Sequence, residues 1–79
     1  MKTKPSDAER LFELGERIAS LRKKQGMTQL SFALKAHISK SFLSDLERGA
    51  RNPSYLTLCH VADALEVDVK DLFEDQTDD

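Results

Sequence analysis

The sequence has little of what disulfide-bonded, metal-binding and membrane-spanning proteins require. Cys59 is the single cysteine among 79 residues, so no intramolecular disulfide can form, and no CxxC pair or histidine-rich cluster offers a metal site. No apolar run is long enough to cross a membrane, and the opening MKTKPSDAER lacks the apolar core of a signal peptide. No nucleophile, paired carboxylates or phosphate loop indicates an enzyme. These absences favour a non-catalytic cytoplasmic protein without cofactor, metal, membrane partner or small-molecule ligand.

What remains is enough chain for one small domain. Apolar residues make up 39% of the sequence, which supports a compact core. Domains of this size bury only about 60% of their unfolded surface, so self-association would add stability. We expect an N-terminal extension over 1–6, a folded domain over 7–74 and a disordered acidic tail over 75–79, because DQTDD has nothing to bury.

Charge is distributed unevenly along the chain. The net charge is −2, but residues 1–52 carry eleven Lys/Arg against six Asp/Glu, hence +5, and residues 53–79 carry one Lys against eight acids, hence −7. Attraction between exposed charges is screened beyond about 8–10 Å at physiological salt, so a basic part can face phosphates while an acidic end points away. The alternative is an ordinary solvated surface. The overall acidity disfavours strong non-specific DNA binding.

Caps and apolar periodicity predict an all-α fold of five helices. Ser6 followed by Glu9 forms a capping box, and no strand pattern appears. The expected helices are 7–25 after Ser6, 29–36 after Thr28, 40–48 after Ser39, one from Ser54 to about Glu66, and 69–74 after Asp68. Gly26, in a left-handed conformation, should end the first helix.

Helical spacing also predicts the buried positions. The expected core comprises Leu11, Leu14, Ile18, Leu21, Met27, all or part of the set Leu30, Ala33 and Leu34, then Phe42, Leu43, Leu46, Leu58, Val61, Ala62, Leu65, Val69, Leu72 and Phe73. The opposite side of the third helix is polar. An arc of about 140° carries Lys40, Ser41, Ser44, Asp45 and Arg48.

Several short motifs resemble the lambda-repressor-like helix-turn-helix fold of the Cro/C1 (XRE) family over about residues 14–73. They are Arg22 with Gly26-Met27-Thr28-Gln29, Ala33, Ile38-Ser39, Leu43-Ser44, Leu46-Glu47-Arg48-Gly49, Asn52-Pro53-Ser54 and Leu72-Phe73. The resemblance implies that the second and third helices form the helix-turn-helix and that the third enters a DNA major groove. Within the family, restriction-modification controller proteins and small phage repressors are the most similar in size.

The resemblance also implies which residues read DNA bases. The candidates are Ser39, Lys40, Ser41, Ser44 and Asp45. Lys40 can donate to guanine O6 and N7, and the two following serines can serve bases or phosphates. Asp45 would accept from cytosine N4 or repel a wrong approach. The alternative for all five is a solvated helix face.

A second set is implied to contact phosphates: Thr28, Gln29, Phe42, Arg48, Arg51 and Asn52. Gln29 begins a helix whose N–H groups form an anion site. Arg51 resembles the loop arginine of the controller proteins. Phe42 lies at the edge of the apolar arc, where a core role competes with contact to a thymine methyl group or a sugar.

Three further positions matter for the fold that the resemblance implies. Arg22 and Glu47 match family positions that form a mostly buried ion pair between the first and third helices. His37 stands where the family often has glycine, so a left-handed residue must carry a side chain there. Glu66 stands likewise where glycine or asparagine often ends the fourth helix. His37 and His60 have no ligand partners at metal spacing.

The family binds operators as symmetric dimers, because one unit contacts only about four to six base pairs. An apolar patch of Leu56, Leu65, Val67 and Val69 would form the dimer surface, or these residues would complete the core. Leu11 and Phe12 form a second candidate surface. The resulting hypothesis is a homodimeric transcriptional regulator on a (pseudo)palindromic double-stranded DNA operator, blocking or recruiting RNA polymerase. The alternative is an antitoxin that binds a toxin and regulates its own operon.

Overall fold

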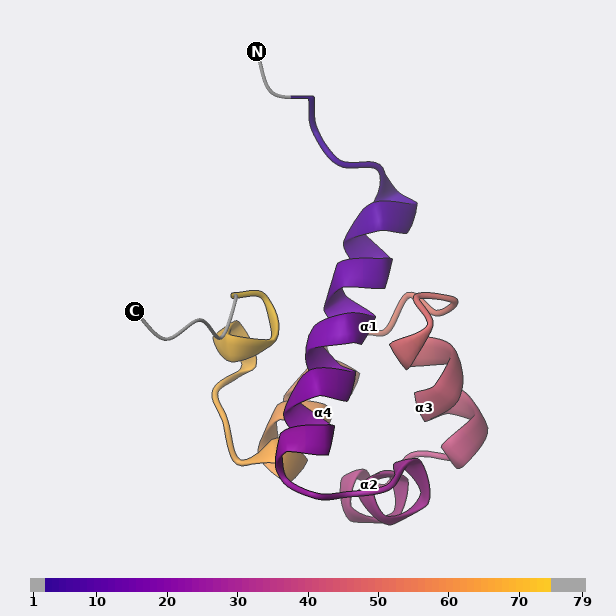
Figure 1. The fold of residues 1–79 in the computed structure, drawn as a ribbon, viewed down its shortest axis with the longest axis vertical. Helices are drawn as coiled ribbons and strands as arrows, with labels where there is room; N and C mark the ends of the chain where they lie inside the picture. Colours follow the sequence, from indigo (N-terminus) through magenta and orange to yellow (C-terminus); the bar gives the residue numbers. More distant parts are fainter. Residues whose placement is uncertain (1–2, 75–79) are drawn as a thin grey trace.

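The computed structural model describes residues 3–74 and shows an all-helical bundle in this part of the chain (Figure 1). Four α-helices, Asp7–Lys24 (α1), Gln29–Ala36 (α2), Lys40–Glu47 (α3) and Tyr55–Leu65 (α4), precede a single 3-10 turn, Val69–Leu72 (η1). α1 runs along the molecule, α2 crosses near its C-terminal end, and α3 and η1 lie on opposite sides of it. No strand occurs in residues 3–74, and the acidic tail expected over 75–79 lies outside the described residues.

Each α-helix begins directly after the hydroxyl residue that the sequence predicts as its cap. The hydroxyl oxygens of Ser6, Thr28, Ser39 and Ser54 accept the backbone N–H three residues later, at distances of 2.9–3.1 Å. At the first helix the reciprocal bond is also present, because the Ser6 N–H donates to Glu9 at 2.9 Å. Hydrogen bonds from the Ser6 backbone and then its side chain lower the pKa of the Glu9 carboxyl. Local sequence therefore fixes where each helix starts.

The prediction of a fifth helix over 69–74 is not confirmed. The segment makes one 3-10 turn that ends at Leu72, within the residues that the structure describes. Leu72 is fully buried and Val69 packs against the core, as expected, but Phe73 is 51% exposed. Leu72 and Val69 hold this short segment against the bundle, whereas Phe73 lies at the surface.

The inward face of α2 differs from the predicted one. Ala33 is buried as expected, but Leu30 and Leu34 are 54% and 69% exposed, and Phe32 is completely buried instead. Phe32 and Ala36 lie four residues apart on one side of the helix, which packs against both α3 and α4. At 100° per residue, the two leucines project about 140–180° away from that side. Their apolar character made them core candidates, but the orientation of α2 leaves them in solvent.

The remaining helices bury the stripes that periodicity predicts. Leu14, Ile18 and Leu21 of α1 are buried, whereas Leu11 is only half-buried near the helix start. In α3, Leu43 and Leu46 are buried, and in α4 the set Leu58, Val61, Ala62 and Leu65 is buried. Met27 is half-buried against this core.

Two side-chain-bearing residues adopt the left-handed conformation at helix ends. His37 has φ 59° after α2 and Glu66 has φ 60° after α4, while Gly26 with φ 73° follows the first helix. The backbone N–H of His37 and of Ile38 donates to carbonyls of α2, which closes that helix. The tight turn between α2 and α3 is therefore formed without glycine.

Candidate nucleic-acid interface

The helix-turn-helix formed by α2 and α3 presents a polar face to solvent. Ser39, Lys40 and Ser41 are exposed, and Ser44 and Asp45 are half-buried. The side opposite is apolar, with Leu43 and Leu46 in the core and Phe42 half-buried against it. The structure thus brings four of the base-reading candidates onto one accessible side of a helix anchored by leucines, and Ser39 lies exposed just before that helix, where its hydroxyl caps it.

An arginine cluster occupies the C-terminal end of this face. One carboxylate oxygen of Asp45, Oδ1, accepts a hydrogen bond from Arg48, and the other, Oδ2, lies 3.6 Å from Nε of Arg51. The guanidinium of Arg51 also lies over the Phe42 ring, 5.1 Å from its centroid, which is a cation–π geometry. Two residues expected to contact phosphate, Arg48 and Arg51, therefore contact one carboxylate that was expected to read a base.

Below this face a buried network joins three helices. Arg22 Nε donates to Glu47 Oε2 at 2.7 Å, and Arg22 Nη2 donates to Oε1 at 2.9 Å. The two side chains are only 8% and 7% exposed. The hydrogen bond with Glu47 raises the pKa of Arg22. The pair that the family resemblance implies is thus present as a bidentate, shielded contact between α1 and α3.

The same network includes a side chain expected to contact DNA. Gln29 Nε2 donates to Oε1 of Glu47 at 2.9 Å, and Nη1 of Arg22 donates to the carbonyl of Met27 at 2.8 Å. The Thr28 hydroxyl is occupied as the α2 cap. Thr28 and Gln29 therefore stand at the start of α2, as predicted, but their side chains already have partners within the protein.

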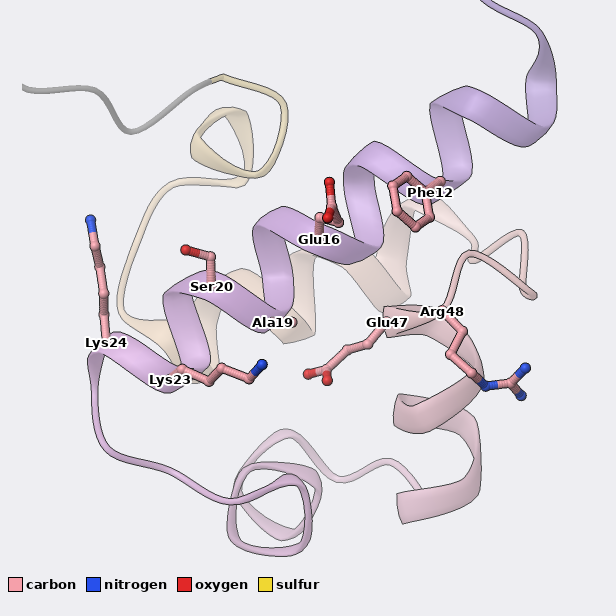
Figure 2. Close-up of a pocket in the computed structure, with 8 residues that line it drawn as sticks. All are labelled: Phe12, Glu16, Ala19, Ser20, Lys23, Lys24, Glu47 and Arg48. Carbon is pink, nitrogen blue, oxygen red and sulfur yellow. The ribbon is translucent and has the colours of Figure 1, made fainter.

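Figure 2 shows the open groove above this network, between α1 and the end of α3. Glu47 points from α3 toward α1, whereas Arg48 points away from it. Phe12 and Glu16 line one part of the groove, and Lys23 lies near its other end. Glu47 thus fixes α3 to the bundle, whereas the adjacent Arg48 faces outward.

Two glycines set the closeness of this packing; sequence reasoning missed Gly15 and named Gly49 only for the end of the third helix and the family motif. A Cβ atom on Gly15 would lie 2.5 Å from the carbonyl oxygens of both Leu46 and Glu47. A Cβ on Gly49, which has φ 78°, would lie 2.8 Å from Cα of Phe12. These are backbone contacts that cannot move independently. For Gly15, the signal available in the sequence was a glycine within an otherwise regular helical pattern, which often marks close packing.

Comparison with known proteins supports the helix-turn-helix formed by α2 and α3. A model of the helix-turn-helix family, HTH_3, matches residues 18–72. The chain belongs to this family, in its XRE type.

Relatives of this helix-turn-helix protein include regulators of phage and bacterial genes. The immunity repressor of Bacillus phage phi105 is 42% identical over 64 residues, which are 81% of this chain and 44% of the repressor. The matched part thus spans less than half of that relative's length. Among solved structures, the restriction-modification controller protein C.AhdI from Aeromonas hydrophila superposes with a TM-score of 0.79 and 32% identity, covering 80% of this chain and 96% of that one.

The solved structure of a further relative contains DNA. The structure of SinR, the master regulator for biofilm formation, in complex with DNA superposes with a TM-score of 0.73 and 39% identity. It covers 77% of this chain and 98% of that one, and SinR itself is a transcriptional regulator of Bacillus subtilis.

This family member exposes apolar side chains at the start of α4, but not all those expected at a dimer surface. Leu56 is 66% exposed, and Val67 and Val69 are half-buried against the core. Leu65 is only 1% exposed, so the expectation that it contributes to an apolar surface patch is wrong. It completes the core of the monomer, because α4 turns it toward the bundle with Val61 and Ala62.

Sequence reasoning also missed an exposed aromatic residue on this face. Tyr55, next to Leu56, is 65% exposed, and a hydrogen bond with the Cys59 thiol raises the pKa of its hydroxyl. Phe73 is likewise exposed, where a core role had been expected. The apolar surface around the start of α4 is therefore larger than the sequence suggests.

Other kinds of site have no counterpart among residues 3–74. No three His, Cys, Asp or Glu side chains in this part of the chain could hold a metal ion together. His37 and His60 line a shallow hollow between the helix-turn-helix and α4, together with Lys35 and Asp63. None of the helices in the described part is long and apolar enough to span a membrane.

Proposed function

We propose that the protein is a sequence-specific DNA-binding transcriptional regulator. The observation that carries this proposal is the exposed polar face of α3, held at a fixed angle by the buried contact of Arg22 with Glu47. The superposition with SinR bound to DNA supports a nucleic-acid role for the same fold. With its helix-turn-helix in that role, α3 enters the major groove while the start of α2 and the loop after α3 lie against phosphates.

Roles on the DNA divide along α3. Lys40 donates to guanine, and Ser39, Ser41 and Ser44 contact neighbouring base edges or phosphates. Arg48, Arg51 and Asn52, all exposed at the far end of the helix and in its following loop, contact the backbone. Gln29 contacts phosphate from the start of α2 while its amide remains anchored on Glu47. Base contacts thus come from the N-terminal half of α3 and phosphate contacts from around it.

We further propose that two copies bind a (pseudo)palindromic operator. One α3 helix reads too few base pairs for useful specificity, and a second copy doubles them. The exposed Tyr55 and Leu56 supply an apolar surface for that contact. Bound across a promoter, such a dimer would block or recruit RNA polymerase, as a restriction-modification controller or phage-type repressor does. The similarity to both kinds of protein supports this assignment.

Footprinting on the DNA upstream of the protein's own gene tests the proposal. We expect protection of two half-sites about one helical turn apart, surviving an excess of random competitor DNA. Sedimentation of the protein with and without this DNA should show two chains per operator. Absence of a protected site at protein concentrations that saturate random DNA would remove the regulator assignment, and protection by a single chain would remove only the dimer.

A further inference from the structure

One carboxylate stands among the positive charges that the proposed DNA face presents. Asp45 lies on the same side of α3 as Lys40 and Ser44, and its two oxygens face Arg48 and Arg51. The side chains of the two arginines are 64% and 53% exposed, while that of Asp45 is 32% exposed. The cluster is therefore open to solvent, and a DNA phosphate can reach the same guanidinium groups.

We propose that Asp45 weakens binding to DNA of every sequence, because its carboxylate competes with phosphate for Arg48 and Arg51. This inference rests on the proposed function, and it assigns Asp45 a role different from reading cytosine. A carboxylate presents to a guanidinium the same pair of anionic oxygens as a phosphate does. Each phosphate contact by these arginines therefore has to replace a contact that the free protein already has.

A positioning role for Asp45 would give the opposite sign, and the geometry argues against it. Arg51 has a second anchor in the Phe42 ring, 5.1 Å from its guanidinium carbon, which keeps it in place without the carboxylate. Arg48 follows directly on α3 and points away from α1 (Figure 2). Removing the charge of Asp45 thus leaves both arginines near the DNA face and removes a negative charge that repels the backbone.

The charge distribution along the chain explains why this competition matters for DNA binding. Residues 1–52 carry a net charge of +5, so the part that contains the helix-turn-helix attracts any polyanion. Binding to random DNA depends on phosphate contacts alone, and a competing carboxylate reduces it directly. Operator binding keeps the additional base contacts from the other half of α3. Asp45 thus limits the amount of protein held on unrelated DNA.

The test compares Asp45→Asn with the wild type on two duplexes of equal length, the footprinted operator and a scrambled sequence. Each exposed ion pair changes an equilibrium by about 1.4- to 5-fold, so losing both should tighten binding about two- to 25-fold on each duplex. The slope of log affinity against log salt should steepen by up to about 0.9, as for one additional phosphate charge neutralised. Fluorescence anisotropy across a salt series measures both quantities.

Three matched variants separate competition from other causes. Asp63→Asn removes the same charge from an exposed position on α4 and should leave both affinities close to those of the wild type. Asp45→Glu keeps the negative charge and should bind both duplexes as weakly as the wild type does. In an Arg51→Ala background, Asp45→Asn should give a smaller gain than in the wild type, because one of the two contested arginines is absent.

The outcomes distinguish this inference from the proposed function. If the wild type binds neither duplex, the proposed function fails. If it binds the operator and Asp45→Asn lowers that affinity alone, Asp45 reads a base and the competition is wrong. Unchanged affinity of Asp45→Asn on both duplexes also overturns the competition. So does an equal gain in affinity from Asp63→Asn, which would show a general effect of net charge. Thermal unfolding of each variant verifies that the folded state is retained.

Discussion

Arg22 of α1 and Glu47 of α3 meet through two parallel hydrogen bonds of 2.7 and 2.9 Å, with both side chains more than nine-tenths shielded from solvent. This contact joins the longest helix to the helix that carries the proposed DNA face. Oε1 of Glu47 also accepts a hydrogen bond from the side-chain amide of Gln29, so the start of α2 is bonded to the same carboxylate. One buried carboxylate of α3 is therefore hydrogen-bonded to both α1 and α2.

Replacing Glu47 with glutamine should destabilise the protein strongly. The shape is preserved, but the guanidinium of Arg22 is left buried without its counter-charge, which typically costs about 3–5 kcal/mol. Urea unfolding followed by circular dichroism measures the change. The matched control is Glu66→Gln, which removes the exposed pair with Lys35 at 3.1 Å and should barely move the midpoint. Equal shifts for the two variants would contradict a special role for the buried pair.

Gly15→Ala should also destabilise, against the usual trend for helices. Alanine within a helix is normally favoured over glycine by about 0.5–1 kcal/mol. Here the new methyl group would meet two backbone oxygens of α3 at 2.5 Å, so the helices must separate, at a cost of about 1–3 kcal/mol. Thermal unfolding decides the sign. Ser20→Ala, at an exposed position of the same helix, serves as the control, and a gain in stability for Gly15→Ala would disprove the close contact.

Lys40→Ala and Arg51→Ala should weaken DNA binding in different ways. Loss of the proposed guanine contact should cost about 1–3 kcal/mol on the operator and little on random DNA. Loss of the backbone contact from Arg51, and likewise Gln29→Ala, should lower both affinities by similar factors. Gel-shift titrations on operator and scrambled duplexes provide the comparison. Equal losses on the two duplexes for Lys40→Ala would refute its base-reading role.

Leu56→Glu should weaken self-association without unfolding the monomer. The side chain is 66% exposed, so a charge there costs the isolated chain little but opposes burial against a second copy. Sedimentation velocity across a dilution series reports the dimer dissociation constant. Leu34→Glu, which alters a leucine of α2 that is 69% exposed, is the matched control and should leave association intact. If both variants dissociate alike, the surface around α4 is not the dimer contact.

The sequence predicts this fold well where the information is local. Ser6, Thr28, Ser39 and Ser54 start their helices because each cap needs only its own hydroxyl and the N–H three residues later. The rotation of a short helix is not local. Eight residues of α2 contain Leu30, Phe32 and Leu34, and only packing against two other helices decides that Phe32 turns inward.

The candidate site shows the same division. The set of residues on the outer side of α3 follows from helical periodicity, and the structure keeps those residues together. Their partners do not follow from periodicity, because Arg51 reaches Asp45 from a loop and Gln29 reaches Glu47 from another helix. Gly15 was overlooked for a related reason. A glycine in a helix gives no sign of which backbone approaches it.

The hydroxyl caps bear on how quickly the chain can fold. Because each helix start is encoded within four residues, helix boundaries form without waiting for distant contacts. The remaining conformational search consists of packing four helices, joined by short connections, against one another. Helical bundles of this kind have low contact order and typically fold within microseconds to milliseconds. A domain of this architecture would therefore reach its folded monomeric form before the slower, concentration-dependent step of pairing with a second copy.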